Sequence, residues 1–194
     1  MAELESLDQF ALGVARDTWE LFRRDPLLFL IAGLAVSLLS TISLGLCAGP
    51  LSAGYIELVR HARRNEPLAL GIVFSRFDTW VPSLIASGLI LVGVLVGFLL
   101  FVIPGLVVAV MTIFTLTVIT YENTTAVAAI TRSVEIVRAT PGHAIALLLM
   151  IAVLHALGSI LVLGMFLAVP LSIIPLTLGY ERLVGAHSPE AISI

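Results

Sequence analysis

The chain contains no lysine, a single cysteine and few charged residues, which make up 12% of its 194 residues. One cysteine excludes a disulfide scaffold, and a formal net charge of −3 excludes a basic surface for nucleic acid. Hydrophobic residues reach 59% and the mean hydropathy is +1.12, which is more apolar surface than a soluble domain of 20.7 kDa can bury. The composition therefore predicts an integral membrane protein, whose first partner is the lipid bilayer.

Charges are absent from three long stretches of the chain, residues 26–56, 79–121 and 139–180. About 20 helical residues cross a hydrocarbon core of ~30 Å. The second and third stretches therefore each predict two crossings, with reversals at Ile103-Pro104-Gly105 and near Leu163-Gly164. The first stretch is ambiguous, because residues 27–47 form one clear span whereas residues 50–59 are too few for another.

The arginines decide this ambiguity, because cytoplasmic loops of membrane proteins carry the excess of basic residues. A single crossing would separate the arginines of residues 16–24 from those of residues 60–76. A hairpin instead places all ten arginines on one side of the membrane. We therefore expect a hairpin whose second arm is a short or tilted helix, or else re-entrant. The protein is then a multi-pass protein of the inner or plasma membrane with both termini in the cytoplasm.

Two sequence patterns occur twice, in the same order. Residues 19–26 (WELFRRDP) match residues 134–141 (VEIVRATP), and residues 50–55 (PLSAGY) match residues 175–180 (PLTLGY). A looser third copy in the middle of the chain places a proline at the reversal and a tyrosine followed by glutamate after it. The repeat motif comprises Pro50, Gly54, Tyr55, Pro104, Tyr121, Pro175, Gly179 and Tyr180.

Each repeat predicts an amphipathic helix, a proline that starts a membrane helix, an outer reversal and a return helix that ends at its tyrosine. Tyrosine is favoured at headgroup depth, which explains one such position, whereas three in register favour duplication. Because every unit begins and ends in the cytoplasm, the repeats are parallel. Inverted repeats are common in ion-coupled transporters, so the pattern weakly disfavours that class.

The fold expected from these patterns is an all-α, polytopic transmembrane bundle of about six membrane segments in one membrane domain, residues 1–194. Three helical hairpins are joined by amphipathic helices. We expect these helices to lie on the membrane surface, and binding of a partner protein is the alternative. In the second connector, Asn123 or Thr124 is able to cap the helix. The expected parts are an interfacial helix at 1–25, hairpins at 26–64 and 65–121, a connector helix with a third hairpin at 122–184, and a tail at 185–194.

Ionisable groups inside a membrane mark sites of transport or catalysis, and His155 is the one deep candidate. A neutral His155 that bonds Ser159 or a backbone carbonyl is the favoured interpretation, and a functional membrane residue is the alternative. The histidines and Cys47 lack the spacing of metal ligands. No nucleophile is paired with a base, so the sequence predicts no enzyme, no metal and no cofactor.

Glycines recur at the spacing that allows close helix packing. They are Gly45 with Gly49 and Gly93 with Gly97. The pattern predicts close approach of helices, either within one protomer or between protomers.

Together, Trp19-Glu20-Leu21-Phe22, Gly49-Pro50-Leu51, Ile103-Pro104-Gly105 and the helix containing Arg132-Ser133 resemble one family. It is the group of uncharacterised bacterial and archaeal integral membrane proteins related to the membrane domain of some glycerophosphoryl diester phosphodiesterases. In that family the phosphodiesterase chemistry belongs to a separate soluble domain, which this sequence lacks. The resemblance therefore implies a six-helix membrane module with no catalytic residue.

The function expected from the sequence is that of a non-enzymatic membrane module that binds lipid or a partner protein, including a second copy of itself. The alternative is a small-solute transporter or channel subunit without ion-coupling charges. No nucleic-acid partner is expected.

Overall fold

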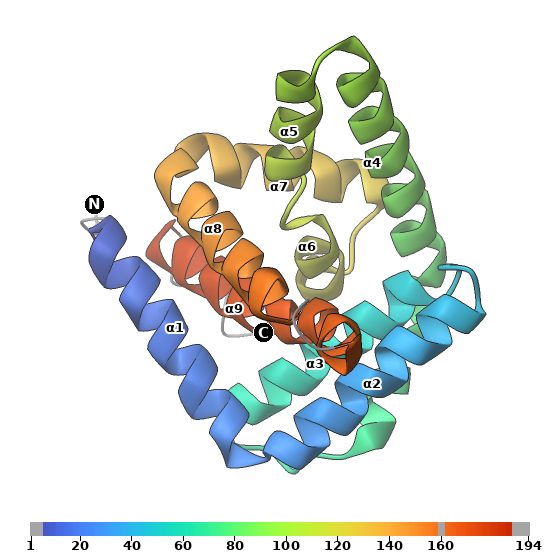
Figure 1. Ribbon diagram of the computed structural model, residues 1–194, viewed down its shortest axis with the longest axis vertical. Helices are drawn as coiled ribbons and strands as arrows, with labels where there is room; N and C mark the ends of the chain where they lie inside the picture. Colours follow the sequence, from blue (N-terminus) through green and yellow to red (C-terminus); the bar gives the residue numbers. More distant parts are fainter. Residues whose placement is uncertain (1–5, 159–161, 188–194) are drawn as a thin grey trace.

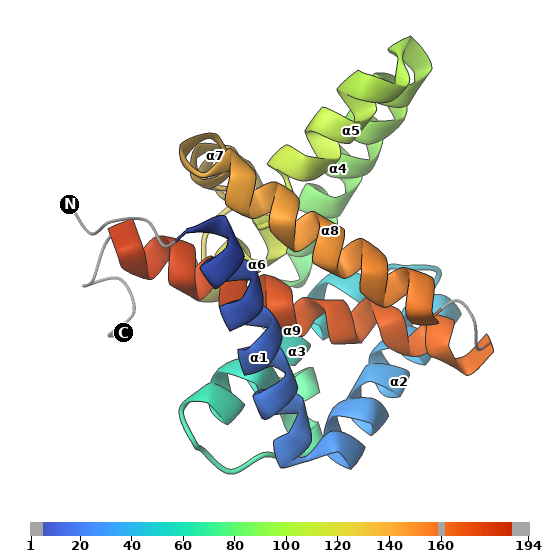
Figure 2. The ribbon, with the colours of Figure 1, turned by 60° about the vertical axis from the view of Figure 1, so that its left-hand side comes forward.

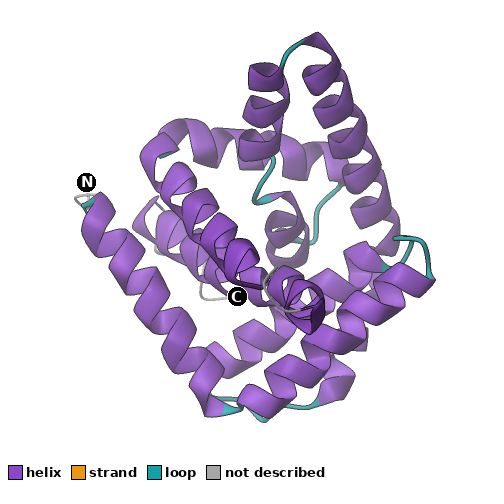
Figure 3. Ribbon diagram, in the orientation of Figure 1, coloured by secondary structure: helices purple, strands orange, loops and turns teal. Residues whose placement is uncertain are grey.

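The protein is described here by a computed structural model that covers residues 6–158 and 162–187. Within these ranges it consists of helices joined by short loops, with no strand (Figures 1 and 3). The all-α prediction is therefore confirmed. In chain order the elements are α1 (Leu7–Arg24), α2 (Pro26–Ile42), α3 (Ala48–Arg63), the 3₁₀ turns η1 (Leu70–Phe74) and η2 (Phe77–Thr79), α4 (Trp80–Leu100), α5 (Val102–Met111), α6 (Thr115–Glu122), α7 (Ala126–Ala139), α8 (Pro141–Gly158) and α9 (Val162–His187).

Three segments are long and apolar enough to cross a membrane, namely Leu70–Leu100, Val102–Glu122 and Pro141–Gly158. The pair α1 and α2 adds a fourth if it is counted as one broken span, since the two helices are bent by 97° at Asp25. The structure is thus that of a protein with several helices able to span a membrane.

Prolines begin two of the apolar helices. Pro26 and Pro141 are the first residues of α2 and α8, where the missing N–H has no intrahelical partner to lose. The Asp25 side chain caps α2 by accepting a hydrogen bond from the Leu28 amide at 3.1 Å. The change from amphipathic to apolar helix is therefore made at a fixed residue, and α1 and α2 point in different directions.

The amphipathic connectors form as expected, with one correction at the cap. Helix α1 buries Phe10, Val14 and Leu21 and packs against α8 and α9. Helix α7 is capped by Thr125, not by Asn123 or Thr124. Asn123 instead ends α6 in the left-handed conformation with φ of 47°, which short polar side chains tolerate.

The reversal between α4 and α5 lies earlier in the chain than the sequence predicts. Phe101, in extended backbone, separates α4 from α5, so Pro104 lies in the first turn of α5. Helix α9 begins at Val162, so Leu163 and Gly164 lie in its first turn, and residues 159–161, which join α8 to α9, lie outside the described residues. A proline is tolerated in a first helical turn, and for that reason it marks the start of the return helix better than the turn itself.

Helix α3 lies at the centre of the molecule and not at its edge. It starts at Ala48, before Pro50, and contacts α2, α4, α6, α9 and η1 (Figure 1). Leu51, Tyr55 and Leu58 are all almost fully buried by protein. The short second arm of the first hairpin is therefore a core helix, covered by neighbours on most of its surface.

The hairpin of α4 and α5 projects away from the remaining helices (Figures 1 and 2). In Figure 2 its turn, the end of α2 and the end of α8 lie on the right-hand side, whereas α7 and the end of α9 lie on the left. Large apolar side chains along α4 and α5 are exposed, including Leu89, Val92, Leu99 and Ile103. Outside a membrane this hairpin would place a large apolar surface in water.

Candidate functional site

Ionisable side chains converge where the C-terminal parts of α3, α6 and α9 meet α1 and α7. We call this group the charged cluster. It consists of Asp17, Glu57, Arg60, Arg63, Tyr121, Glu122, Arg132, Tyr180, Glu181 and Arg182.

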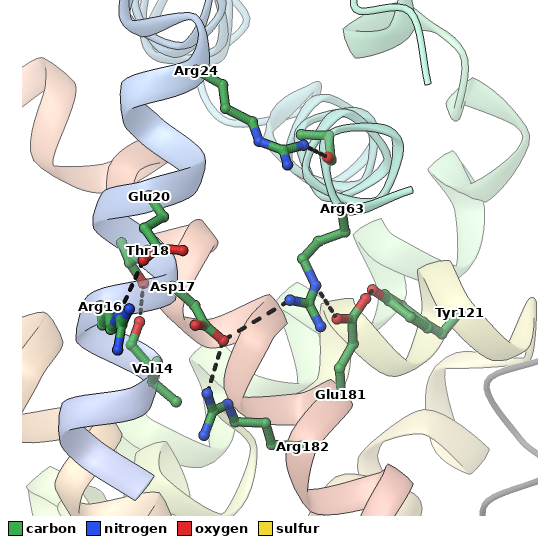
Figure 4. Close-up of polar contacts among 11 residues, drawn as sticks. Val14, Arg16, Asp17, Thr18, Glu20, Arg24, Arg63, Tyr121, Glu181 and Arg182 are labelled. Atoms are coloured by element: carbon green, nitrogen blue, oxygen red, sulfur yellow. Dashed lines mark hydrogen bonds and ion pairs between the residues drawn. The ribbon is translucent and has the colours of Figure 1, made fainter. Parts of the chain in front are cut away.

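Glu181 connects three helices within the charged cluster (Figure 4). Its carboxylate accepts a hydrogen bond from the Tyr121 hydroxyl of α6 and pairs with Arg63 Nε of α3 at 3.1 Å. Its side chain is only 12% exposed. On the other side, Asp17 of α1 lies 2.8 Å from Arg182 and 3.9 Å from Arg63. Arg63 thus joins α1 and α9 through two carboxylates.

Two of the motif tyrosines form a reciprocal pair. The Tyr121 hydroxyl donates to Glu181, and the Tyr180 hydroxyl donates to Glu122 at 3.0 Å. Each tyrosine therefore bonds the glutamate that follows the other, and the two ring centroids are 5.1 Å apart. The Arg60 guanidinium lies over the Tyr121 ring, 4.3 Å from its centroid, a favourable cation–π geometry.

Tyr55 lies apart from this pair. Its buried hydroxyl donates to the Phe29 carbonyl oxygen at 3.4 Å, and its ring meets the Phe29 ring edge-on. The prediction that each return helix ends at its tyrosine holds for α6 alone, because α3 continues to Arg63 and α9 to His187. No helix-breaking residue directly follows Tyr55 or Tyr180, whereas Asn123 ends α6 two residues after Tyr121.

The charges of the cluster balance. Its four carboxylates each have a phenol or guanidinium partner within 3.1 Å, and its four arginines are matched to them in number. A paired carboxylate is poorly suited to act as a general base, and a balanced cluster gives no net attraction to a charged solute. Chemically, the cluster fits a clamp that holds five helices together.

The motif glycines lie at close helix contacts. A Cβ added to Gly54 would lie 1.9 Å from the Val73 carbonyl oxygen of η1, and one added to Gly179 would lie 2.5 Å from the Leu147 side chain. Of the predicted packing glycines, Gly49 meets Ser83, Gly93 meets Val108 and Gly97 meets Gly105. Gly45 lies in the turn after α2 with φ of 84°, and a Cβ there would meet nothing within 4 Å.

His155 is exposed on α8, and its Nδ1 lies 2.9 Å from the Ile151 carbonyl oxygen one turn earlier. That carbonyl can only accept, so this nitrogen carries the proton and the ring is held by its own helix. Ser159, the other expected partner, lies outside the described residues. Among the motif prolines, Pro50 and Pro104 lie in first turns and Pro175 lies inside α9.

Ser133 has a role that sequence reasoning missed. The span Val102–Glu122 is broken between α5 and α6, at residues 112–114. The Ser133 hydroxyl of α7 donates to the Met111 carbonyl at 2.8 Å and accepts from the Phe114 amide at 3.2 Å. It thereby satisfies two backbone groups that the break leaves without helical partners. No glycine or proline at residues 112–114 signals the break.

An apolar groove of about 270 Å³ lies between α1, α8 and α9. Its lining consists of Ala15, Thr18, Trp19, Phe22, Met150, Leu154, Leu171 and Ile174. A second cavity, of about 350 Å³, lies between α4 and the break that separates α5 from α6, and Ser87, Thr112 and Thr115 contribute hydroxyl-bearing side chains to its lining. Among the described residues, no three His, Cys, Asp or Glu side chains gather as metal ligands would.

Comparison of the chain with protein-family models, with curated protein sequences and with solved structures finds no match. The site must therefore be interpreted from its own geometry.

Proposed function

We propose that the protein is a non-enzymatic, multi-pass module of the inner or plasma membrane that binds membrane lipid. In this proposal the three hairpins α2–α3, α4–α6 and α8–α9 provide six membrane segments, and α1 and α7 lie along the cytoplasmic surface. The charged cluster then lies at the cytoplasmic ends of the return helices, and both termini lie on the same side. The common direction of the hairpin turns in Figure 2 supports this topology.

The observation that carries the proposal is the groove between α1, α8 and α9, since it is apolar and is bordered by an amphipathic helix. Trp19, on α1, lines the groove and is 59% exposed. Tryptophan is enriched at the membrane–water interface, so this position suits the boundary between headgroups and acyl chains. The paired state of the charged cluster supports a structural rather than a catalytic use of the polar residues.

Lipid binding is testable on the purified full-length protein by native mass spectrometry after exhaustive delipidation in detergent. We expect at least one phospholipid to remain bound at a defined stoichiometry. Ala15→Phe, which fills the groove, should reduce the amount of bound lipid. Leu12→Phe, on the exposed face of the same helix, is the matched control and should leave it unchanged. Complete loss of lipid from the native protein under conditions that preserve its fold would contradict the proposal.

The topology is testable by cysteine labelling, because Cys47, at the turn before α3, is the one cysteine of the chain and can be replaced. In a Cys47→Ala background, Asn65→Cys and Ser188→Cys should react with a membrane-impermeant maleimide only after the membrane is opened. Labelling of Asn65→Cys, but not of Ser188→Cys, on intact cells would mean that the first hairpin crosses once, which overturns the three-hairpin arrangement.

A small-solute transporter is the second candidate, favoured by the break at residues 112–114 and the adjacent cavity of about 350 Å³. Discontinuous membrane helices form the substrate sites of several transporter folds. Flux of labelled solutes into liposomes that contain the protein separates the two candidates. Saturable uptake that Thr112→Val reduces would favour the transporter, whereas no uptake above empty liposomes agrees with the lipid-binding module.

A further inference from the structure

We infer that the groove between α1, α8 and α9 binds one anionic phospholipid, with an acyl chain in the groove and its phosphate at Arg23. This inference rests on the proposed lipid-binding function and names the class of lipid.

Arg23 lies next to an aromatic side chain of the groove wall. Its guanidinium lies 5.9 Å from the centroid of the Trp19 ring, and that ring lines the groove next to Phe22. The Trp19 and Phe22 rings are stacked with their centroids 6.3 Å apart. A cation is therefore held beside the mouth of an apolar groove by an aromatic wall.

The neighbouring arginines of α1 are engaged by other groups. Arg16 pairs with Glu20 at 3.0 Å, and Arg24 donates to the Ala62 carbonyl oxygen of α3 at 2.7 Å. The contact described for Arg23 is with the face of Trp19, and that contact leaves its N–H donors able to bind an anion. One guanidinium offers two parallel hydrogen bonds to a phosphate.

The side chains of the groove wall favour an acyl chain as the occupant. The groove wall is almost entirely apolar, with Thr18 as its hydroxyl-bearing member, and the Thr18 hydroxyl already donates to the Val14 carbonyl at 2.7 Å. An acyl chain needs no hydrogen bond, whereas an extended peptide segment placed there would lose those of its backbone. Charge complementarity with Arg23 then selects an anionic headgroup over a zwitterionic one.

The test uses the quenching of Trp19 fluorescence by lipids with brominated acyl chains, in a Trp80→Phe background of the full-length protein in mixed micelles. Brominated phosphatidylglycerol should reach half-maximal quenching at about a fivefold lower mole fraction than brominated phosphatidylcholine, the preference expected from one arginine at an anionic headgroup. Arg23→Gln should bring the two curves together, and the matched control Arg16→Gln should leave them apart. Ala15→Phe should weaken quenching by both lipids.

The outcomes separate the two levels of the proposal. Equal quenching of the unsubstituted groove by both lipids, abolished by Ala15→Phe, would overturn the anionic preference and leave lipid binding intact. Quenching by both lipids that Ala15→Phe does not change would overturn occupation of the groove, and with it the proposed function. Loss of preference in Arg16→Gln as well as in Arg23→Gln would show a diffuse effect of charge and would overturn the assignment to Arg23.

Discussion

The α4–α5 hairpin and helix α3 invert the usual relation between hydrophobicity and burial. The hairpin carries no charge, yet Leu89 is 48% exposed and Leu99 is 87% exposed. Helix α3 carries Glu57, Arg60 and Arg63, yet Leu58 in the same helix is completely buried. In a membrane protein, lipid is an acceptable environment for an apolar side chain but not for a charged one. The helix with charges is therefore at the centre, where its partners are.

The largest difference between the two regions should be seen at their glycines. Gly54→Ala places a Cβ within 1.9 Å of the Val73 carbonyl oxygen, which is backbone and cannot rotate away. We expect a loss of about 3 kcal/mol or more in the free energy of unfolding in detergent. Gly88→Ala on α4 meets nothing within 4 Å and should be neutral or stabilising by less than about 1 kcal/mol. Similar stability of the two variants would contradict the contact between α3 and η1.

The next effect concerns the charges around α3. Glu181→Ala removes the acceptor of both Arg63 and Tyr121. We expect a loss of roughly 2 kcal/mol, because the partly buried Tyr121 hydroxyl loses a charged acceptor, whereas the ion pair of the exposed Arg63 adds little. Glu135→Ala is the control, since its ion pair with Arg132 is exposed and should contribute less than about 1 kcal/mol. Chemical unfolding in mixed micelles measures both. An equal, small loss would mean that the charged cluster does not clamp the helices.

One leucine in α3 and one in the α4–α5 hairpin test the effect of burial directly. Leu58→Ala should cost about 2 kcal/mol, the low end for a buried leucine, because lipid or detergent also solvates the apolar side chain in the unfolded protein. Leu89→Ala, on the exposed hairpin, should change stability by less than about 0.5 kcal/mol. The comparison of thermal unfolding midpoints is sufficient. A larger effect at Leu89 would indicate that the hairpin is covered by another protein chain.

The smallest effect is expected where the hairpin joins the rest of the molecule. Ser133→Ala leaves the Met111 carbonyl and the Phe114 amide without their side-chain partner, at a cost of about 1 kcal/mol. Thr131→Ala, whose hydroxyl bonds the Val127 carbonyl on an exposed face, is the control. Hydrogen exchange should accelerate at the Phe114 amide in the first variant alone. Unchanged exchange there would exclude Ser133 as the residue that stabilises the break.

Prolines and charges predict most of the helix starts and of the charge-free segments. Pro26 and Pro141 start helices because a proline at that position loses no hydrogen bond, and this rule needs only the residue itself. The sequence predicts Asn123 or Thr124 as the cap of α7, whereas Thr125, with an equivalent hydroxyl, caps the helix. Caps with equivalent side chains in a row cannot be told apart locally, because the choice depends on where the preceding helix ends.

The sequence patterns do not predict the charged cluster, although all of its residues are ordinary ionisable side chains of the sequence. The repeat pattern predicts that Tyr121 and Tyr180 occupy equivalent positions, but it does not predict that each bonds the glutamate that follows the other. It also gives no reason why Tyr55 should contact Phe29 instead. The resemblance to the membrane domain of phosphodiesterases and the six-segment topology stay predictions, because no comparison bears on them.

The sequence by itself determined the helical class, the presence of several apolar helices long enough to cross a membrane, and the reversal between α4 and α5 to within a few residues. These properties follow from composition, charge-free length and backbone preferences, each of which acts over a few residues. Only the tertiary structure decided that α3 is central, that Arg63 joins Asp17 to Glu181, and that α1 closes a groove on α8 and α9. Those contacts join residues far apart in the chain, so they depend on the directions in which whole helices leave their turns.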